Sequence, residues 1–191
     1  MQSYTYKVER SNVFDETIVK AVIELDALVY PEDLRGDTLG ERARFKKDPT
    51  AFLLLKANEH IVGYFCFFPI TKLLQETVFT TSKLVDNDIG PDDITPYKKG
   101  EKHMLFIISI VVHPKHRGAP SKMLLDAFFQ SVKHMHQTRY PIEGMVAYAV
   151  SGKGSSTLER FGFGKYKTVE QGYTLYHATI DAFLKAGEQH G

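Results

Sequence analysis

The sequence contains no tryptophan and a single cysteine, Cys66, among its 191 residues. One thiol cannot form an intramolecular disulfide, so we expect a reducing, cytoplasmic setting. The sequence also has no excess of charge, because 24 Lys and Arg stand against 23 Asp and Glu. With no basic field and no polybasic segment, we predict that neither nucleic acid nor a membrane surface is a partner.

No apolar run is long enough to span a bilayer, and residues 1–10 lack the apolar core of a signal peptide. No repeat, low-complexity tract or Gly/Ser linker divides the chain. Hydrophobic residues make up 43% and charged residues 25%, which is typical of a globular protein. Together with the length, this predicts a single domain over residues 1–191.

Apolar periodicity predicts a mixed α/β (α+β) fold. The run 105–112, Leu-Phe-Ile-Ile-Ser-Ile-Val-Val, is typical of a central strand buried on both faces. The other predicted elements are a strand over 4–8, a helix over 18–28, a short helix over 39–45, a β-hairpin of strands 52–57 and 61–68, a helix from Pro120 to Met135, a strand over 145–150, a short helix over 155–161 and a strand over 172–178.

Residues 71–102 contain three turn signals, Asp-Asn-Asp, Gly-Pro-Asp-Asp and Tyr-Lys-Lys-Gly. We predict an insertion loop here, with one extra strand near Glu76–Thr80. Loops of this length beside a site often cover it, so we expect the insertion to be a lid over a functional site. A plain surface excursion is the alternative.

Basic residues gather where the central strand is followed by a helix. Lys115, His116, Arg117 and Lys122 surround the start of that helix, and Gly118 lets the backbone come close to a bound oxyanion. The first amides of a helix have no partners within it, so this arrangement predicts a diphosphate site. Pro120 removes one of these amide donors, and the alternative is a set of solvated charges at a turn.

The same stretch resembles a known family. Val111 to Gly118, Val-Val-His-Pro-Lys-His-Arg-Gly, followed by a helix with Leu124 and Leu125, is similar to the acetyl-coenzyme A motif of the GNAT superfamily of N-acyltransferases. Ile61-Val62-Gly63-Tyr64, within 52–68, is similar to the family's second and third strands. The segment 158–163, Leu-Glu-Arg-Phe-Gly-Phe, looks like its C-terminal motif.

The resemblance implies a GNAT-like mixed, splayed central sheet flanked by helices, with coenzyme A between strands 105–112 and 145–150. Backbone amides of the first strand would contact the pantetheine arm and the thioester, the basic loop would hold the pyrophosphate, and a residue after the second strand would lie near the cofactor. The residues that match these positions are Ile110, Val111, Val112, Arg117, Gly118, Ala119, Ser121, Lys122 and Ser151.

The sequence departs from the family's pattern in two places. Ala119-Pro120-Ser121-Lys122 stands where glycines are expected, and Leu158 stands where the family often has a tyrosine that protonates the departing thiolate. The catalytic residues therefore stay unassigned. Other sources of that proton are Ser155, Ser156, Tyr148, Tyr166 and Tyr173, and the candidate bases are Glu101, His103 and Glu143. His134 and His136 face different ways on a helix, so we expect no metal site.

The resemblance implies an acyl-CoA-dependent N-acyltransferase, and an acetyltransferase in particular, that uses acetyl-CoA as co-substrate. The acceptor is expected to be a small-molecule or peptide amine. The sequence leaves the oligomeric state open, with a homodimer as one alternative. Residues 30–40 and the insertion would line the acceptor side, where Glu32, Asp33, Asp37 and Glu41 favour a cationic amine. The alternative is a non-catalytic GNAT-like binding or regulatory domain that keeps coenzyme A binding.

Overall fold

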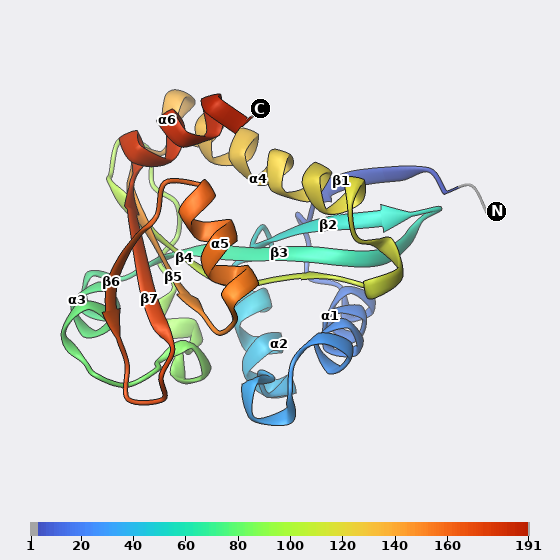
Figure 1. Cartoon of the computed structure of the whole chain (residues 1–191), viewed down its shortest axis with the longest axis horizontal. Helices are drawn as coiled ribbons and strands as arrows, with labels where there is room; N and C mark the ends of the chain where they lie inside the picture. The colour runs from blue at the N-terminus through green and yellow to red at the C-terminus, as the bar shows by residue number, and fades with distance from the viewer. Residues whose placement is uncertain (1–3, 191) are drawn as a thin grey trace. The chain divides into compact units, whose positions relative to one another are not determined.

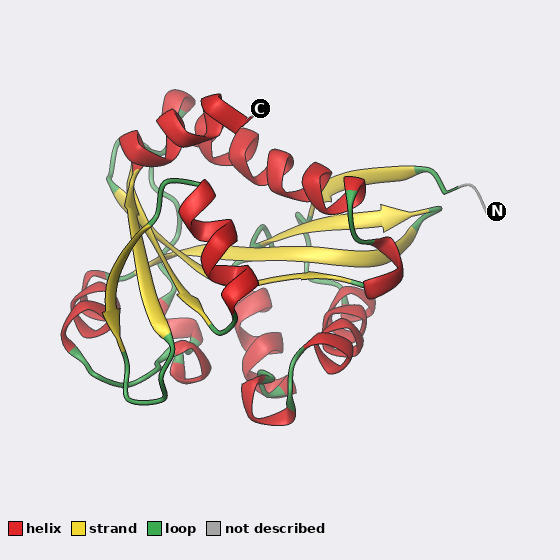
Figure 2. Cartoon of the chain, viewed as in Figure 1, coloured by secondary structure: helices red, strands yellow, loops and turns green. Residues whose placement is uncertain are grey.

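The computed structural model describes residues 4–190 and contains strands and helices along most of this range (Figures 1 and 2). The strands are β1 (Tyr6–Arg10), β2 (Phe52–Ala57), β3 (His60–Ile70), β4 (His103–Val112), β5 (Ile142–Ala149), β6 (Gly164–Thr168) and β7 (Thr174–Thr179). The helices are α1 (Glu16–Val29), α2 (Thr38–Lys47), α3 (Lys72–Thr80), α4 (Ala119–Thr138), α5 (Gly152–Arg160) and α6 (Ile180–His190). Short 3-10 helices cover Glu32–Leu34, Asp86–Asp88, Pro91–Asp93 and Pro114–His116.

The strands form a mixed seven-stranded sheet in the order β1-β2-β3-β4-β5-β7-β6. β4 and β5 are parallel, whereas β1 with β2, β2 with β3, β5 with β7 and β6 with β7 form antiparallel pairs. Pairing of β4 with β5 ends at Ile107 and Ala147, although β4 continues to Val112. This is the splayed arrangement that the resemblance implies, and it confirms the predicted α/β fold class.

The chain divides into two compact units, and β3, β4 and α4 each continue from one unit into the other. The first unit contains the residues up to 67 together with 109–128, and the second contains 68–108 together with the residues from 129 onward. The prediction of a single domain over 1–191 stays a prediction.

In the first unit, both faces of β2 and β3 are covered by helices. On one face, Phe52 of β2 packs edge-on against Phe45 of α2, with ring centroids 5.0 Å apart. On the other face, Phe65 of β3 stacks on Phe128 of α4 at 4.0 Å. Figure 1 shows α1 and α2 on one side of these strands and the first half of α4 on the other. Alternation along β3 thus gives this unit an apolar layer on each face.

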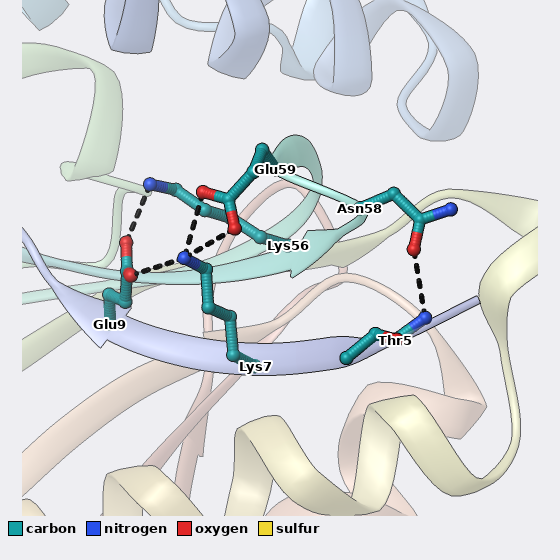
Figure 3. A network of polar contacts seen from close by, with 6 residues as sticks. All are labelled: Thr5, Lys7, Glu9, Lys56, Asn58 and Glu59. Carbon is teal, nitrogen blue, oxygen red and sulfur yellow. Dashed lines mark hydrogen bonds and ion pairs between the residues drawn. The ribbon is translucent and has the colours of Figure 1, made fainter.

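A charged network on the surface joins β1, β2 and the turn between β2 and β3 (Figure 3). Lys7 Nζ lies 2.9 Å from a Glu9 oxygen and 2.6 Å from a Glu59 oxygen, and Lys56 Nζ lies 2.5 Å from Glu9. These side chains are largely exposed, so their ion pairs add little stability. The register of β1 on β2 rests instead on backbone pairing, which runs from the pair Tyr6 and Ala57 to the pair Arg10 and Leu53.

In the second unit, β5, β7 and β6 form an antiparallel sheet that also has helices on both faces. Phe183 of α6 lies 5.3 Å from Phe129 of α4 and 5.9 Å from Phe161. On the opposite face, the ring of Phe79 in α3 contacts His177 of β7 at 5.5 Å.

Several predicted elements need correction. Residues 76–80 are not a strand but the second half of α3, because Leu74 and Val78 recur at helical spacing and are buried, and Thr71 caps the helix by accepting from Leu74 N. The insertion is therefore not simply a loop. The sequence interpretation also missed β6 and α6. In β4, residues 108–110 are only half-buried, so burial on both faces holds for the beginning and the end of this strand alone.

Among residues 4–190, no helix combines the length and the apolar character that a membrane span requires.

Candidate functional site

The predicted strand, loop and helix N-terminus are present in the first unit. His113 ends β4 by donating its backbone N–H to Val62 O at 2.8 Å. A 3-10 turn follows at Pro114–His116, and Gly118 takes a φ of +95°, a conformation that favours glycine. No atom lies within 4 Å of the place where a Cβ would stand on Gly118. The backbone is therefore open at the residue where α4 begins.

The start of α4 offers both charge and amide donors. Lys115, Arg117 and Lys122 are exposed, and no carboxylate among the described residues pairs with any of them. The Lys122 N–H already donates to Gly118 O at 3.2 Å, and Pro120 has no N–H. This leaves the amides of Ala119 and Ser121 as the first-turn donors.

Aromatic residues of the N-terminal segment hold this loop. Tyr6 Oη lies 3.0 Å from His116 Nδ1, and the Tyr4 ring meets the His116 ring edge-on at 4.9 Å. His113 Nδ1 accepts from the Lys115 backbone N–H at 3.1 Å. Burial, followed by the charges of His116 and Lys115, lowers the pKa of His113, which favours the neutral ring that this acceptor role needs.

Eight of the nine predicted cofactor-binding residues lie on this one strand-loop-helix segment. Ile110 is half-buried in β4, whereas Val111 and Val112 are buried. In the loop and the first turn of α4, Ser121 is half-buried and the others, Arg117, Gly118, Ala119 and Lys122, are exposed. The ninth, Ser151, lies in the second unit, where its Oγ accepts from Gly154 N at 3.1 Å and caps α5.

The same unit contains a buried polar cluster that the sequence interpretation did not identify as a site. Tyr64 of β3 is 1% exposed and donates its hydroxyl to Asp26 Oδ1, on a carboxylate of α1 that is 6% exposed. Tyr64 Oη also lies 3.1 Å from Ser109 Oγ of β4, and Tyr30 Oη lies 3.1 Å from the same Ser109 oxygen. Glu41 of α2 lies beside Asp26, and each carboxyl group acts on the pKa of the other.

Burial dominates the electrostatics of this cluster. It raises the pKa of Asp26, although hydrogen bonds from Tyr64 and Glu41 oppose the rise. Burial and the neighbouring charge of Asp26 raise the pKa of Glu41 to about 7, against an ordinary value of 4.5. Two adjacent carboxyl groups with displaced pKa values are a pattern found at functional sites.

The other predicted catalytic candidates lie in the second unit and have structural partners in most cases. Glu143 pairs with Lys72 at 2.7 Å, Glu101 pairs with Lys98 at 3.4 Å, and His103 is buried with its Nε2 3.1 Å from the Lys98 backbone. Tyr148 differs, because its hydroxyl is buried without a hydrogen-bond partner among the described residues, and burial raises its pKa to about 12.

The C-terminal motif has a structural explanation. Phe163 N donates to Leu158 O and Gly162 N donates to Glu159 O, each at 3.1 Å, which closes the end of α5. Gly162 has a φ of +79°, and a Cβ there would lie 2.5 Å from Ala182 O. The side chain of Leu158 is half-buried.

No group of three or more His, Cys, Asp or Glu side chains within residues 4–190 is placed to hold a metal ion.

No family model matches the sequence, and no curated protein sequence matches it significantly. Solved structures match its fold. The loading GNATL domain of CurA from Lyngbya majuscula superposes with a TM-score of 0.68 at 16% identity, over 93% of this chain and 98% of that chain. The GNAT-like decarboxylase GphF, in complex with isobutyryl-CoA, gives 0.61 at 13% identity, over 91% and 98%. The chain has the GNAT fold.

A third GNAT structure is Naa50 of Arabidopsis thaliana in complex with the bisubstrate analogue CoA-Ac-MVNAL. It superposes with a TM-score of 0.58 at 12% identity, over 92% of this chain and 99% of that chain. The GNAT fold predicted from the resemblance is thereby confirmed. At these sequence identities, the likeness establishes the fold of the chain and no activity.

Proposed function

We propose that this protein binds acyl-CoA on the segment from β4 to the first turn of α4 and transfers the acyl group, most simply acetyl, to an amine. The observation that carries this proposal is the open helix N-terminus at Gly118, with three exposed basic side chains that no carboxylate within residues 4–190 pairs. Helix amides and unpaired cations together attract a diphosphate.

The backbone of Ile110 to Val112 is suited to bind the pantetheine and thioester half of acyl-CoA. Pairing of β4 with β5 stops at Ile107, before these residues. Backbone N–H groups are the donors that stabilise an oxyanion in acyl transfer. In the proposed enzyme these amides bind the pantetheine arm and the thioester carbonyl, and CoA leaves as the thiol.

The acceptor side is proposed to take a cationic amine, of a small molecule or a peptide. Glu32, Asp33 and Asp37 are exposed in the segment between α1 and α2, and Asp26 and Glu41 lie on these two helices. Acidic side chains attract a protonated amine and orient it before its proton is removed.

The test is calorimetric titration of the wild-type chain and of Arg117→Glu with acetyl-CoA. A single charge-assisted contact is worth about 1.5 to 3 kcal/mol, so reversal of this charge should raise Kd at least about tenfold. Lys185→Glu, the same reversal on exposed Lys185 of α6, is the matched control and should leave Kd unchanged. Equal affinity of wild type and Arg117→Glu would remove the loop from the site.

A non-catalytic acyl-CoA-binding domain is the second candidate. It is favoured by Pro120, which removes one amide from the first turn of α4, and by the apolar side chain at Leu158. Release of free thiol from acetyl-CoA over a panel of amines separates the two functions. Binding with thiol release supports the enzyme, whereas binding without it supports the second candidate.

A further inference from the structure

Three hydroxyl groups in the first unit form an unbroken chain that ends at a carboxylate. Tyr30 Oη lies 3.1 Å from Ser109 Oγ, which lies 3.1 Å from Tyr64 Oη, and Tyr64 Oη contacts Asp26 Oδ1. The chain joins α1, β3 and β4, three elements that only the fold brings together. Tyr30 and Ser109 are half-buried, whereas Tyr64 and Asp26 are buried.

The direction of this chain follows from counting protons. Tyr64 has one hydroxyl proton, and its contact with the Asp26 carboxylate uses that proton. Ser109 therefore donates to Tyr64 Oη. Because Ser109 has then used its own proton, Tyr30 donates to Ser109 Oγ. All donors point from Tyr30 toward Asp26, which is the orientation in which a proton can pass from hydroxyl to hydroxyl.

The carboxylate at the inner end can store a proton. Asp26 and Glu41 are neighbouring carboxyl groups, and burial together with the charge of Asp26 raises the pKa of Glu41 to about 7. Glu41 Oε2 is buried and has no hydrogen-bond partner among residues 4–190. Near neutral pH the proton of the pair therefore resides on Glu41, and Asp26, which accepts from Tyr64, is left as the acceptor of a second.

We propose that the Tyr30–Ser109–Tyr64 chain carries the excess proton of the acceptor amine to Asp26. The proposal rests on the proposed acyl transfer and adds how the amine becomes a nucleophile. Ser109 directly precedes Ile110, Val111 and Val112, which the proposed function places at the thioester. Tyr30 Oη, the outer end of the chain, lies 3.1 Å from the side chain of Ser109, which precedes the backbone that would hold the reacting group.

The ammonium gives a proton to Tyr30 Oη as Tyr30, Ser109 and Tyr64 each pass their own proton inward, so that Asp26 becomes protonated. The amine lone pair attacks the thioester carbonyl carbon, and the C–S bond breaks with its electron pair on sulfur. The second amine proton leaves as the amide forms and ends on the CoA thiolate. Glu41, which is half-buried, then releases its stored proton to water and takes up the proton of Asp26, and the three hydroxyl groups rotate back to their first orientation.

Other charged groups face the carboxyl pair and set when it accepts a proton. The Arg35 and Arg44 guanidinium groups favour ionisation, whereas Asp37 opposes ionisation of Glu41. The remaining titratable neighbours are Tyr30 and Tyr64, the buried thiol of Cys66 on β3, and Asp48 at the end of α2. Arginine charge keeps one proton-accepting site in the pair despite burial.

Tyr64→Phe and Ser109→Ala interrupt the chain with the smallest change in shape. Each should lower kcat/KM for the amine about 10²-fold near pH 7, as expected when base assistance is lost. The deficit should shrink toward zero as pH approaches the amine pKa, because solvent then removes the proton. Kd for acetyl-CoA should stay within about twofold of the wild type.

Glu24→Gln is the matched control, because Glu24 is exposed on α1, pairs only weakly with Lys20 at 3.9 Å and lies outside the chain. Its pH profile should coincide with that of the wild type. A deficit in Tyr64→Phe and Ser109→Ala that is the same at every pH indicates a structural role and overturns the relay, as does wild-type activity in both.

A second readout does not depend on turnover. Carbon-13 NMR of carboxyl-labelled protein should show one carboxyl group that titrates near neutral pH and is absent in Glu41→Gln. A pair that is fully ionised from pH 5 upward overturns the relay.

If the wild type binds acetyl-CoA but releases no thiol with any amine, the proposed enzyme fails. Wild-type turnover with unaffected variants rejects the relay alone.

Discussion

Gly63 of β3 faces the backbone of β4 so closely that a Cβ on it would lie 2.8 Å from Val111 O. The same Cβ would lie 3.2 Å from Val112 Cα. Only glycine lets the two strands approach to this degree. The segment of β4 that the proposed function assigns to the thioester is thus fixed in place by a residue without a side chain.

Gly63→Ala should therefore force β3 and β4 apart. We expect a loss of about 1 to 3 kcal/mol in the free energy of unfolding, the usual cost of overpacking. Urea denaturation measures it. Gly164→Ala is the control, because nothing lies within 4 Å of a Cβ there, and its midpoint should stay near that of the wild type. Equal midpoints for both variants would contradict the close approach.

The loop before α4 is held by a bond from β1. Tyr6→Phe removes the contact of Tyr6 Oη with His116 Nδ1 at 3.0 Å but keeps the ring. A neutral hydrogen bond is worth about 1 kcal/mol, so a looser loop should raise Kd for acetyl-CoA about fivefold. Calorimetry measures the change. Tyr166→Phe, on exposed Tyr166 of β6, should leave Kd unaltered. Unchanged affinity in Tyr6→Phe would mean that this contact does not shape the site.

Local patterns predicted the parts of the fold that depend on neighbouring residues. The hairpin of β2 and β3 and the helix that begins at Pro120 follow from alternation and from the proline preference for a first helical turn. The strand predicted near 76–80 was wrong. Threonines at 77 and 80 favour a strand locally, but burial of Leu74 and Val78 on one face stabilises a helix instead.

The candidate site could be predicted only in part. Residues 110–122 are contiguous, so one motif identified them. The relay was missed because Tyr64 lies 38 residues from Asp26 and 45 from Ser109 along the chain. One signal was available, since Asp26 continues the buried stripe of Val19 and Val22 on α1. A carboxylate on an apolar stripe needs a partner, but the sequence does not say which.

Glu41 should make stability depend on pH in an unusual direction. Its folded pKa of about 7 lies above the ordinary 4.5, so the proton favours the folded state. This contribution is complete below about pH 4.5 and is lost as pH rises through 7. Glu41→Gln mimics the protonated acid, and it should stabilise the protein at pH 8 by at most about 3 kcal/mol and by little at pH 5. Thermal unfolding at both pH values measures this. A pH-independent difference between Glu41→Gln and wild type would contradict the raised pKa, and Glu24→Gln should show no difference at either pH.

Lys167 of β6 joins the insertion to the sheet of the second unit. Its ammonium donates to Phe79 O at 2.9 Å and also to Thr81 O, which satisfies carbonyl groups at the end of α3. Lys167→Met keeps the apolar stem but leaves these carbonyls without that donor. Because hydrogen bonds to a charged group are worth about 1.5 to 3 kcal/mol, α3 should open more easily. Hydrogen exchange should show faster exchange of the α3 amides, whereas acetyl-CoA affinity should not change.

Lys165→Met is the control on the same strand, since Lys165 is exposed and pairs with Glu159 at 3.6 Å. Equal exchange in the two variants would show that the Lys167 contacts do not hold α3.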